Sequence, residues 1–253
     1  MRAILGASTA TLALMAAAPL AASPSVYTAM PDEPAAVTVS AIGDGRADDT
    51  AAIQQAIDKA AQGPAGKGVG GGIVFLPQGT YRISRTLFLW PGVRIFGVGE
   101  KRPVIVLGAK TAGFQRGVAH MLVFAGSARE RDPKDTREVA FPPPGSVPFI
   151  KNVADANPGT FYSALGNIDF RILDGNPAAT AIRFHSAQHS FVSHVDFDIG
   201  SGLAGLYHVA NEAEDLHFRG GRYGILAEKP SPAWPFALVD STFEGQRDAA
   251  IRE

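Results

Sequence analysis

A short repeat in the second half of the chain restricts the fold more than any other feature. The tetrapeptides NIDF, HVDF, DLHF and DSTF end at Phe170, Phe197, Phe218 and Phe243, at intervals of 27, 21 and 25 residues. A second series of apolar runs, AIRF, GLYH, GILA and AIRE, begins at positions 181, 205, 224 and 250. Two strand series that advance together at about 20 to 27 residues per cycle predict a parallel β-helix with stacked coils.

Strand alternation predicts which side chains of this repeat face solvent. Equivalent positions of stacked coils lie about 4.8 Å apart. If the four phenylalanines face inward, so do Ile168, Val195, Leu216 and Ser241, and the residues between them face outward. We name the outward columns by their first members. The Asn167 column holds Asn167, His194, Asp215 and Asp240; the Asp169 column holds Asp169, Asp196, His217 and Thr242; the Arg171 column holds Arg171, Asp198, Arg219 and Glu244.

These columns bring carboxylates, imidazoles and guanidinium groups within reach of one another. Carboxylates at strand spacing repel when both are ionised, so at least one pKa is expected to rise, as a general acid near neutral pH requires. The alternative is a polar face that only solubilises the sheet. On the functional interpretation, the predicted catalytic residues are Asp196, Asp198 and Asp215. The predicted substrate-binding residues are Asp169, His194, His217, Arg219 and Asp240.

The first half predicts one helix followed by short strands. In GDGRADDTAAIQQAIDKAA, Asp49 or Thr50 is expected to cap the helix, and apolar residues recur at helical spacing from Ile53 to Ala60. IVFLPQGTYRIS and TLFLWPGVRIFGVG follow as short apolar runs closed by turns. This order indicates an all-β architecture with one α-helix at its beginning.

Three of these segments also carry a family resemblance. GDGRADDTAAIQQAI, GGGIVFLPQGTYRIS and WPGVRIFGVG, in this order over about 60 residues, resemble the entry segment of the pectate lyase superfamily. That group includes polygalacturonase-like enzymes, phage tailspikes and family 55 exo-β-1,3-glucanases. The resemblance implies a right-handed parallel β-helix with an N-terminal capping α-helix.

Three later segments, NPGTFYSALGNIDF, GSGLAGLYHV and FRGGRYGI, look closer to the family 55-like branch. Members of that branch are larger, with two β-helical halves and a substrate cleft between them. Their catalytic acid is expected in the later half, which has no counterpart here. The resemblance therefore assigns no catalytic residue in this chain.

Composition excludes several functional classes. The chain of 253 residues has no cysteine, which rules out disulfides, thiolate metal sites and cysteine nucleophiles. Lys plus Arg number 23 against 24 for Asp plus Glu, with no basic stretch, so nucleic acid is not an expected partner. No nucleotide-binding loop, Gly-x-Ser-x-Gly elbow or His-Glu-x-x-His motif is present in the sequence.

The N-terminus predicts export. Residues 1–22 hold one arginine, a modest apolar run and a small-residue exit, which is typical of a secretory signal peptide. The alternative is an uncleaved anchor. We therefore expect a secreted or periplasmic protein in which residues 23–253 form the β-helix domain, with no membrane span after cleavage.

A long, shallow β-helix surface suits a polysaccharide, and a glycoside hydrolase is the favoured function. Asp196 and Asp198, two residues apart on one strand face, lie about 6.5 to 7 Å apart, at the lower edge of the inverting range. No cofactor or metal is needed for this chemistry. Tyr223 and Trp234 are candidate sugar-stacking planes.

Two alternatives remain open. In a pectate-type lyase, the aspartates would hold Ca²⁺ while Arg219 or Arg183 abstracts a proton. In a non-catalytic glycan-binding or structural module, the surface would bind without turnover.

Two segments bear on completeness and access. DAAIRE ends the chain within the second strand series without a covering segment, so we expect a missing C-terminal half or self-association through this open end. Full activity is accordingly not expected of this chain alone. The aperiodic region 127–158 is expected to leave the core, either lining a binding surface or only covering it.

Overall fold

The computed structural model describes residues 23–63, 71–127, 145–147, 153–156, 160–227 and 235–253. The predicted signal peptide, Trp234 and most of the region 127–158 lie outside the described residues. Within the described part no helix is long and apolar enough to cross a membrane.

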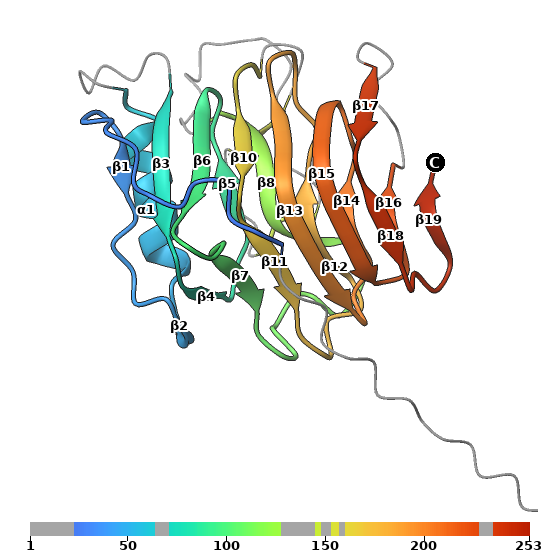
Figure 1. Ribbon diagram of the computed structural model, residues 1–253. Helices are drawn as coiled ribbons and strands as arrows, with labels where there is room; N and C mark the ends of the chain where they lie inside the picture. The colour runs from blue at the N-terminus through green and yellow to red at the C-terminus, as the bar shows by residue number, and fades with distance from the viewer. Residues whose placement is uncertain (1–22, 64–70, 128–144, 148–152, 157–159, 228–234) are drawn as a thin grey trace, which may run out of the picture.

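Two curved parallel sheets face each other (Figure 1), and the main apolar core lies between them. The larger sheet contains β1 (Val37–Thr38), β2 (Asp44–Asp48), β3 (Gly72–Pro77), β4 (Thr80–Ile83), β6 (Val93–Val98), β7 (Val104–Leu107), β10 (Ala164–Gly166), β11 (Asp169–Ile172), β13 (Phe191–Gly200), β15 (Asn211–Gly220), β17 (Phe236–Val239) and β18 (Thr242–Glu244). The smaller sheet contains β5 (Leu87–Leu89), β8 (Ala119–Ser127), β9 (Ala154–Asp155), β12 (Ala179–Arg183), β14 (Ala204–Tyr207), β16 (Tyr223–Leu226) and β19 (Ala249–Arg252). Among the described strands, β9 alone pairs antiparallel, with β8.

In each coil the chain passes first through the larger sheet and then through the smaller sheet. The coil β10–β11–β12 stacks on β6–β7–β8, and β13–β14, β15–β16 and β17–β18–β19 follow in order. In β13 and β15 one unbroken strand replaces the two separate segments of the other coils. The parallel β-helix predicted from the repeat is therefore confirmed.

The single described helix, α1 (Thr50–Ala60), lies at the N-terminal end of the stack (Figure 1). Its buried residues include the predicted Ile53, Ala56, Ile57 and Ala60, and it contacts β1, β3 and β5. The predicted cap is wrong in detail. Asp49 makes no side-chain cap; its carboxylate accepts from the Ile42 and Gly43 amides, which leaves the neighbouring Asp48 to accept from the Thr50 amide.

Stacked phenylalanines form the spine of the core. The rings of Phe170, Phe197, Phe218 and Phe243 lie 6.0, 4.8 and 4.7 Å apart from one coil to the next. The first three rings are at most 1% exposed. Strand pairing aligns these residues directly, as Phe197 with Phe218 shows. The inward column predicted from the repeat is therefore confirmed.

Truncation of Phe197, in the middle of this stack, tests how much the stack contributes to the free energy of unfolding. Phe197→Ala is expected to lower the free energy of unfolding by about 3 to 5 kcal/mol, because the lost ring leaves a cavity between two neighbours. Phe191→Ala is the matched control, since Phe191 lies half-buried on the outer face of the same strand. Urea unfolding measures both. Equal losses in the two variants would contradict a core carried by the inward column.

Candidate functional site

The Asn167 column marks a corner of every coil that it crosses. Asn167, His194, Asp215 and Asp240 all have positive φ, at 58°, 55°, 51° and 46°. Asparagine, aspartate and histidine are the non-glycine residues that adopt this left-handed conformation most readily. The column is therefore a bend in the larger sheet, where the sequence had predicted an ordinary outward strand position.

The first member of this column is structural. Asn167 is fully buried, and its amide donates to Ser25 Oγ (2.9 Å) and the Gly97 carbonyl (2.8 Å). Its Oδ1 accepts from the Val26 amide at 3.0 Å. The outward position predicted for Asn167 is covered because residues 23–27, which we name the N-terminal arm, lie across the outer face of the sheet.

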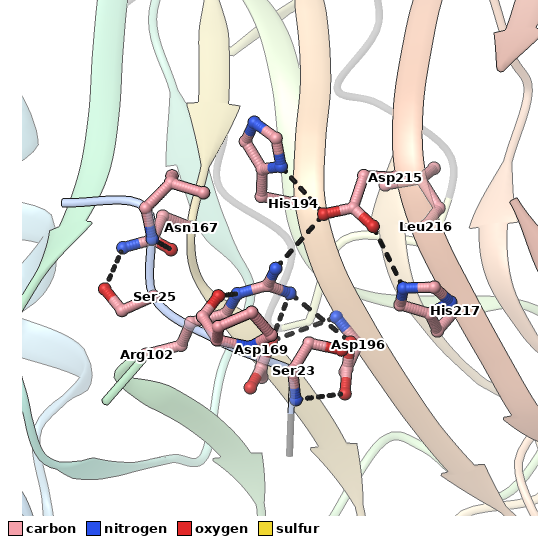
Figure 2. Close-up of polar contacts among 12 residues, drawn as sticks. Ser23, Ser25, Arg102, Asn167, Asp169, His194, Asp196, Asp215, Leu216 and His217 are labelled. Atoms are coloured by element: carbon pink, nitrogen blue, oxygen red, sulfur yellow. Dashed lines mark hydrogen bonds and ion pairs between the residues drawn. The ribbon is translucent and has the colours of Figure 1, made fainter. Parts of the chain in front are cut away.

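Arg102 joins three coils at one point (Figure 2). Its guanidinium is 1% exposed and lies 3.5 Å from Asp169, 3.3 Å from Asp196 and 3.2 Å from Asp215. Its Nε donates to the Pro24 carbonyl of the arm at 3.0 Å. Arg102 precedes β7, outside the repeat, and the sequence reasoning did not identify it.

Asp196 and Asp169 form the buried part of this network. Asp196 is 3% exposed and accepts from Ser23 Oγ (2.7 Å), Arg102 (3.3 Å) and Arg219 (3.3 Å). Asp169 is 8% exposed and accepts from the Asp196 amide at 2.9 Å. Burial raises the pKa of Asp169 to about 6. The structure therefore places the predicted catalytic Asp196 beneath the arm rather than at the surface.

Asp215 forms the accessible part. Its side chain is 30% exposed and lies between His194 Nδ1 (2.7 Å) and His217 Nε2 (3.0 Å), as Figure 2 shows. Burial acts to raise the pKa of Asp215, but the hydrogen bond with His194 and the charge of Arg102 outweigh it, so the pKa lies below its ordinary value. Asp215 is therefore ionised at neutral pH, in the state of a base or nucleophile.

Other predicted site residues line the same face. Asp240 is exposed and follows Asp215 in its column, between the pairs Glu214–Val239 and His217–Thr242. Arg219 is 27% exposed. We name His194, Asp215, His217, Arg219 and Asp240 the accessible strip. Asp198 pairs with Arg219 across the strands, as the repeat predicts, but its carboxylate contacts Arg171 at 3.1 Å.

Three further expectations from the sequence concern a sugar-stacking residue, a catalytic arginine and a metal site. Tyr223 is 3% exposed, and the guanidinium groups of Arg222 and Arg252 pack over its ring, so it offers no open sugar-stacking plane. Arg183 is buried and binds both carboxylate oxygens of Asp155, which leaves Arg219 as the exposed arginine of the lyase alternative. No group of three or more His, Cys, Asp or Glu residues in the described part is arranged to hold a metal.

The chain matches a family model over most of its length. Residues 36–250 match the model described as "Rhamnogalacturonase A/epimerase, pectate lyase-like". Among curated proteins, "Mannuronan C5-epimerase AlgE3" of Azotobacter vinelandii is 45% identical over 74 residues, covering 26% of this chain and 4% of that protein. "Plasmin and fibronectin-binding protein A" of Streptococcus pneumoniae is 53% identical over 49 residues, covering 19% of this chain and 6% of that protein.

Solved structures match over a longer stretch at lower identity. The Azotobacter vinelandii mannuronan C-5 epimerase AlgE4 A-module is 18% identical, with a TM-score of 0.41 over 82% of this chain and 48% of that one. The catalytic unit of a GH87 α-1,3-glucanase from Streptomyces thermodiastaticus is 14% identical, with a TM-score of 0.44 over 90% of this chain and 44% of that one. This chain thus spans less than half of either solved chain and less than a tenth of either curated relative.

Asp196→Asn is expected to destabilise the fold, because Arg102 and Arg219 would lose a buried counter-charge. We expect the free energy of unfolding to fall by at least about 2 kcal/mol. Asp198→Asn is the matched control: it removes a half-exposed carboxylate from the same strand and should cost less than about 1 kcal/mol. Urea unfolding at neutral pH compares them. A loss in Asp196→Asn no larger than in the control would show that the buried network adds nothing.

Asp169→Asn is expected to change how stability depends on pH. The folded pKa of about 6 exceeds the ordinary value of 3.8, so the stability contributed by the proton on Asp169 is present below 3.8 and lost as the pH rises through about 6. Relative to wild type, the variant should therefore gain stability between about pH 4 and pH 7, on the order of 2 kcal/mol. Urea unfolding across this range tests it, and a constant difference between the two proteins would contradict it.

Proposed function

The chain belongs to the rhamnogalacturonase A/epimerase, pectate lyase-like family, and on that premise we propose that it is a carbohydrate-active protein that binds a polysaccharide along the accessible strip. One observation supports the choice of this strip as the binding surface. Asp215 is the member of the carboxylate cluster that combines a lowered pKa, contacts with two histidines and a side chain open to solvent. A ligand that crosses the coils would meet His194, Asp215 and Asp240 in succession.

The hydrogen-bond donors of the strip support an acidic polysaccharide as the ligand. His194 and His217 flank Asp215, and Arg219 lies further along β15; all three carry hydrogen-bond donors for carboxylate groups on a sugar chain. An extended polymer suits a surface in which equivalent groups recur at each coil, about 4.8 Å apart. The substrate class proposed here is therefore a polymer that contains uronate residues.

Glycoside hydrolysis is the reaction that we favour. It requires one carboxylic acid to protonate the leaving oxygen and one carboxylate to act as nucleophile or base. Asp215 supplies the ionised carboxylate, and Asp240, on the next coil at the same corner, is the second carboxyl group of the proposed pair. Their coil spacing of about 4.8 Å is near the separation of about 5 to 5.5 Å that retaining enzymes use. Asp215 would then attack the anomeric carbon as Asp240 protonates the departing oxygen. Asp240 would next take a proton from the water that releases the sugar from Asp215.

This assignment replaces the pair Asp196 and Asp198 on physical grounds. Asp196 is covered by Ser23 and held by two guanidinium groups, so a sugar ring has no access to it without displacement of the arm. Asp198 is half-exposed but paired with Arg171, and it stays a candidate for substrate contact. In this proposal, the buried carboxylates hold the surface in place and the corner carboxylates react.

Proton abstraction from a sugar carbon is a second candidate, favoured by the two histidines. His194 and His217 each contact Asp215, which orients both imidazoles. In an epimerase-type or lyase-type reaction, one imidazole would take the proton and a uronate carboxylate would carry the developing charge. The family description includes an epimerase, and the curated protein AlgE3 is named as one.

Asp215→Asn is expected to lower turnover of a uronate-containing polysaccharide by at least about 100-fold, because both candidate reactions need its charge. Glu214→Gln is the matched control, since Glu214 is an exposed carboxylate one position away on β15. Release of reducing ends from a panel of polysaccharides measures turnover, and thermal unfolding verifies that both variants fold. Full activity in Asp215→Asn would move the site elsewhere.

The products separate the candidates. New saturated reducing ends indicate hydrolysis, unsaturated ends indicate elimination, and an inverted uronate carbon without cleavage, detected by NMR, indicates epimerisation. Asp240→Asn should abolish hydrolysis while leaving proton abstraction at the histidines intact. Binding without any product would support the non-catalytic module.

A further inference from the structure

The N-terminal arm is fixed along its whole length. Ser23 contacts Asp196, the Pro24 carbonyl accepts from Arg102, and both Ser25 and Val26 contact Asn167. The Tyr27 carbonyl accepts from the Gly99 amide at 2.9 Å, and its ring packs edge-on against Phe96 at 5.6 Å. Every residue of the arm therefore has a partner on the sheet or the adjoining turns.

The arm begins at a cluster in which carboxylates outnumber guanidinium groups. Asp169, Asp196 and Asp215 contribute three carboxylates, whereas Arg102 and Arg219 contribute two guanidinium groups. His194 and His217 contact Asp215 alone among the three, on its exposed side. Because an uncompensated buried carboxylate is costly, a further cation beside Asp196 would stabilise the fold.

Ser23 is placed to supply that cation. Its backbone nitrogen lies 3.4 Å from Asp196 Oδ2, and its hydroxyl lies 2.7 Å from Asp196 Oδ1, as Figure 2 shows. As a peptide nitrogen this group is a neutral donor with one hydrogen. As an α-ammonium group it would be charged and carry three.

We propose that cleavage between Ala22 and Ser23 converts the Ser23 nitrogen into an α-ammonium group that ion-pairs with the buried carboxylate of Asp196. A leader peptidase adds water across the Ala22–Ser23 peptide bond, leaving a carboxylate on Ala22 and an ammonium group on Ser23. The position follows from the predicted signal peptide over residues 1–22, which lies outside the described residues.

The consequence is a fold that is completed by processing. Asp196 contacts Arg102 and Arg219, and Arg102 in turn contacts Asp215. The new ammonium group therefore stabilises the carboxylates of a network that extends to Asp215 and Arg219 in the accessible strip. This inference concerns stability and maturation, and it stands whether or not the strip is catalytic.

The test compares proteins that differ only at the N-terminus. One begins at Ser23, released from a fusion partner by a protease that leaves no residue behind; a second begins at Ala22; a third begins at Ser23 with an acetylated amine. We expect the free Ser23 form to have a Tm about 2 to 4 °C higher than the other two. Ser23→Ala, which keeps the ammonium group, should retain most of this advantage.

Two carboxylate variants locate the effect. In Asp196→Asn the difference between free and acetylated amines should vanish, whereas in Asp198→Asn it should persist. If Asp196→Asn does not fold, the acylation rate of the Ser23 amine in the wild-type protein tests the ion pair instead. An amine bound to Asp196 should react about tenfold more slowly than the same amine in the unfolded chain. N-terminal sequencing of the exported protein should give Ser23 first. A different first residue, equal Tm values or an unprotected amine would overturn the proposal.

Discussion

Direct stacking of one phenylalanine on the next is the interaction on which the rest of this structure depends. It fixes the register between coils, because a shift by one residue would send the whole inward column to the solvent face. Residues that lie about two dozen positions apart in sequence thereby become neighbours on the outer face. The Asn167, Asp169 and Arg171 columns exist only because this inner column is continuous from Phe170 to Phe243.

Above that core, one guanidinium divides the acidic residues into two groups. Arg102 and the N-terminal arm bury Asp169 and Asp196. The same guanidinium also contacts Asp215, which is partly exposed. Charge pairing in the interior thus holds an ionised carboxylate at the surface. The burial of Asp196 and the accessibility of Asp215 are two outcomes of one arrangement.

The sequence predicts the coils well, but it does not predict that the N-terminal arm and Arg102 cover the acidic residues. Phe197, Val195 and their counterparts recur at nearly regular intervals, so periodicity alone predicts the inward column and the cross-strand pairs such as Asp198 with Arg219. The arm reaches Asp196 from 173 residues away, and Arg102 lies outside the repeat, so no local pattern reveals either contact. The left-handed corner did leave a signal: its four positions hold only asparagine, histidine and aspartate, which alternation rules treat as ordinary polar residues.

At that corner, the left-handed backbone limits which reactive side chains a coil can present. Side chains that tolerate left-handed backbone at low cost are few, and three of them, asparagine, aspartate and histidine, span an inert amide, a charged oxygen donor and a titrating ring. Exchanges among these three would alter what a coil presents to a ligand without a new bend having to evolve. A lineage of such solenoids can therefore diversify its reactions at one edge while the scaffold stays constant.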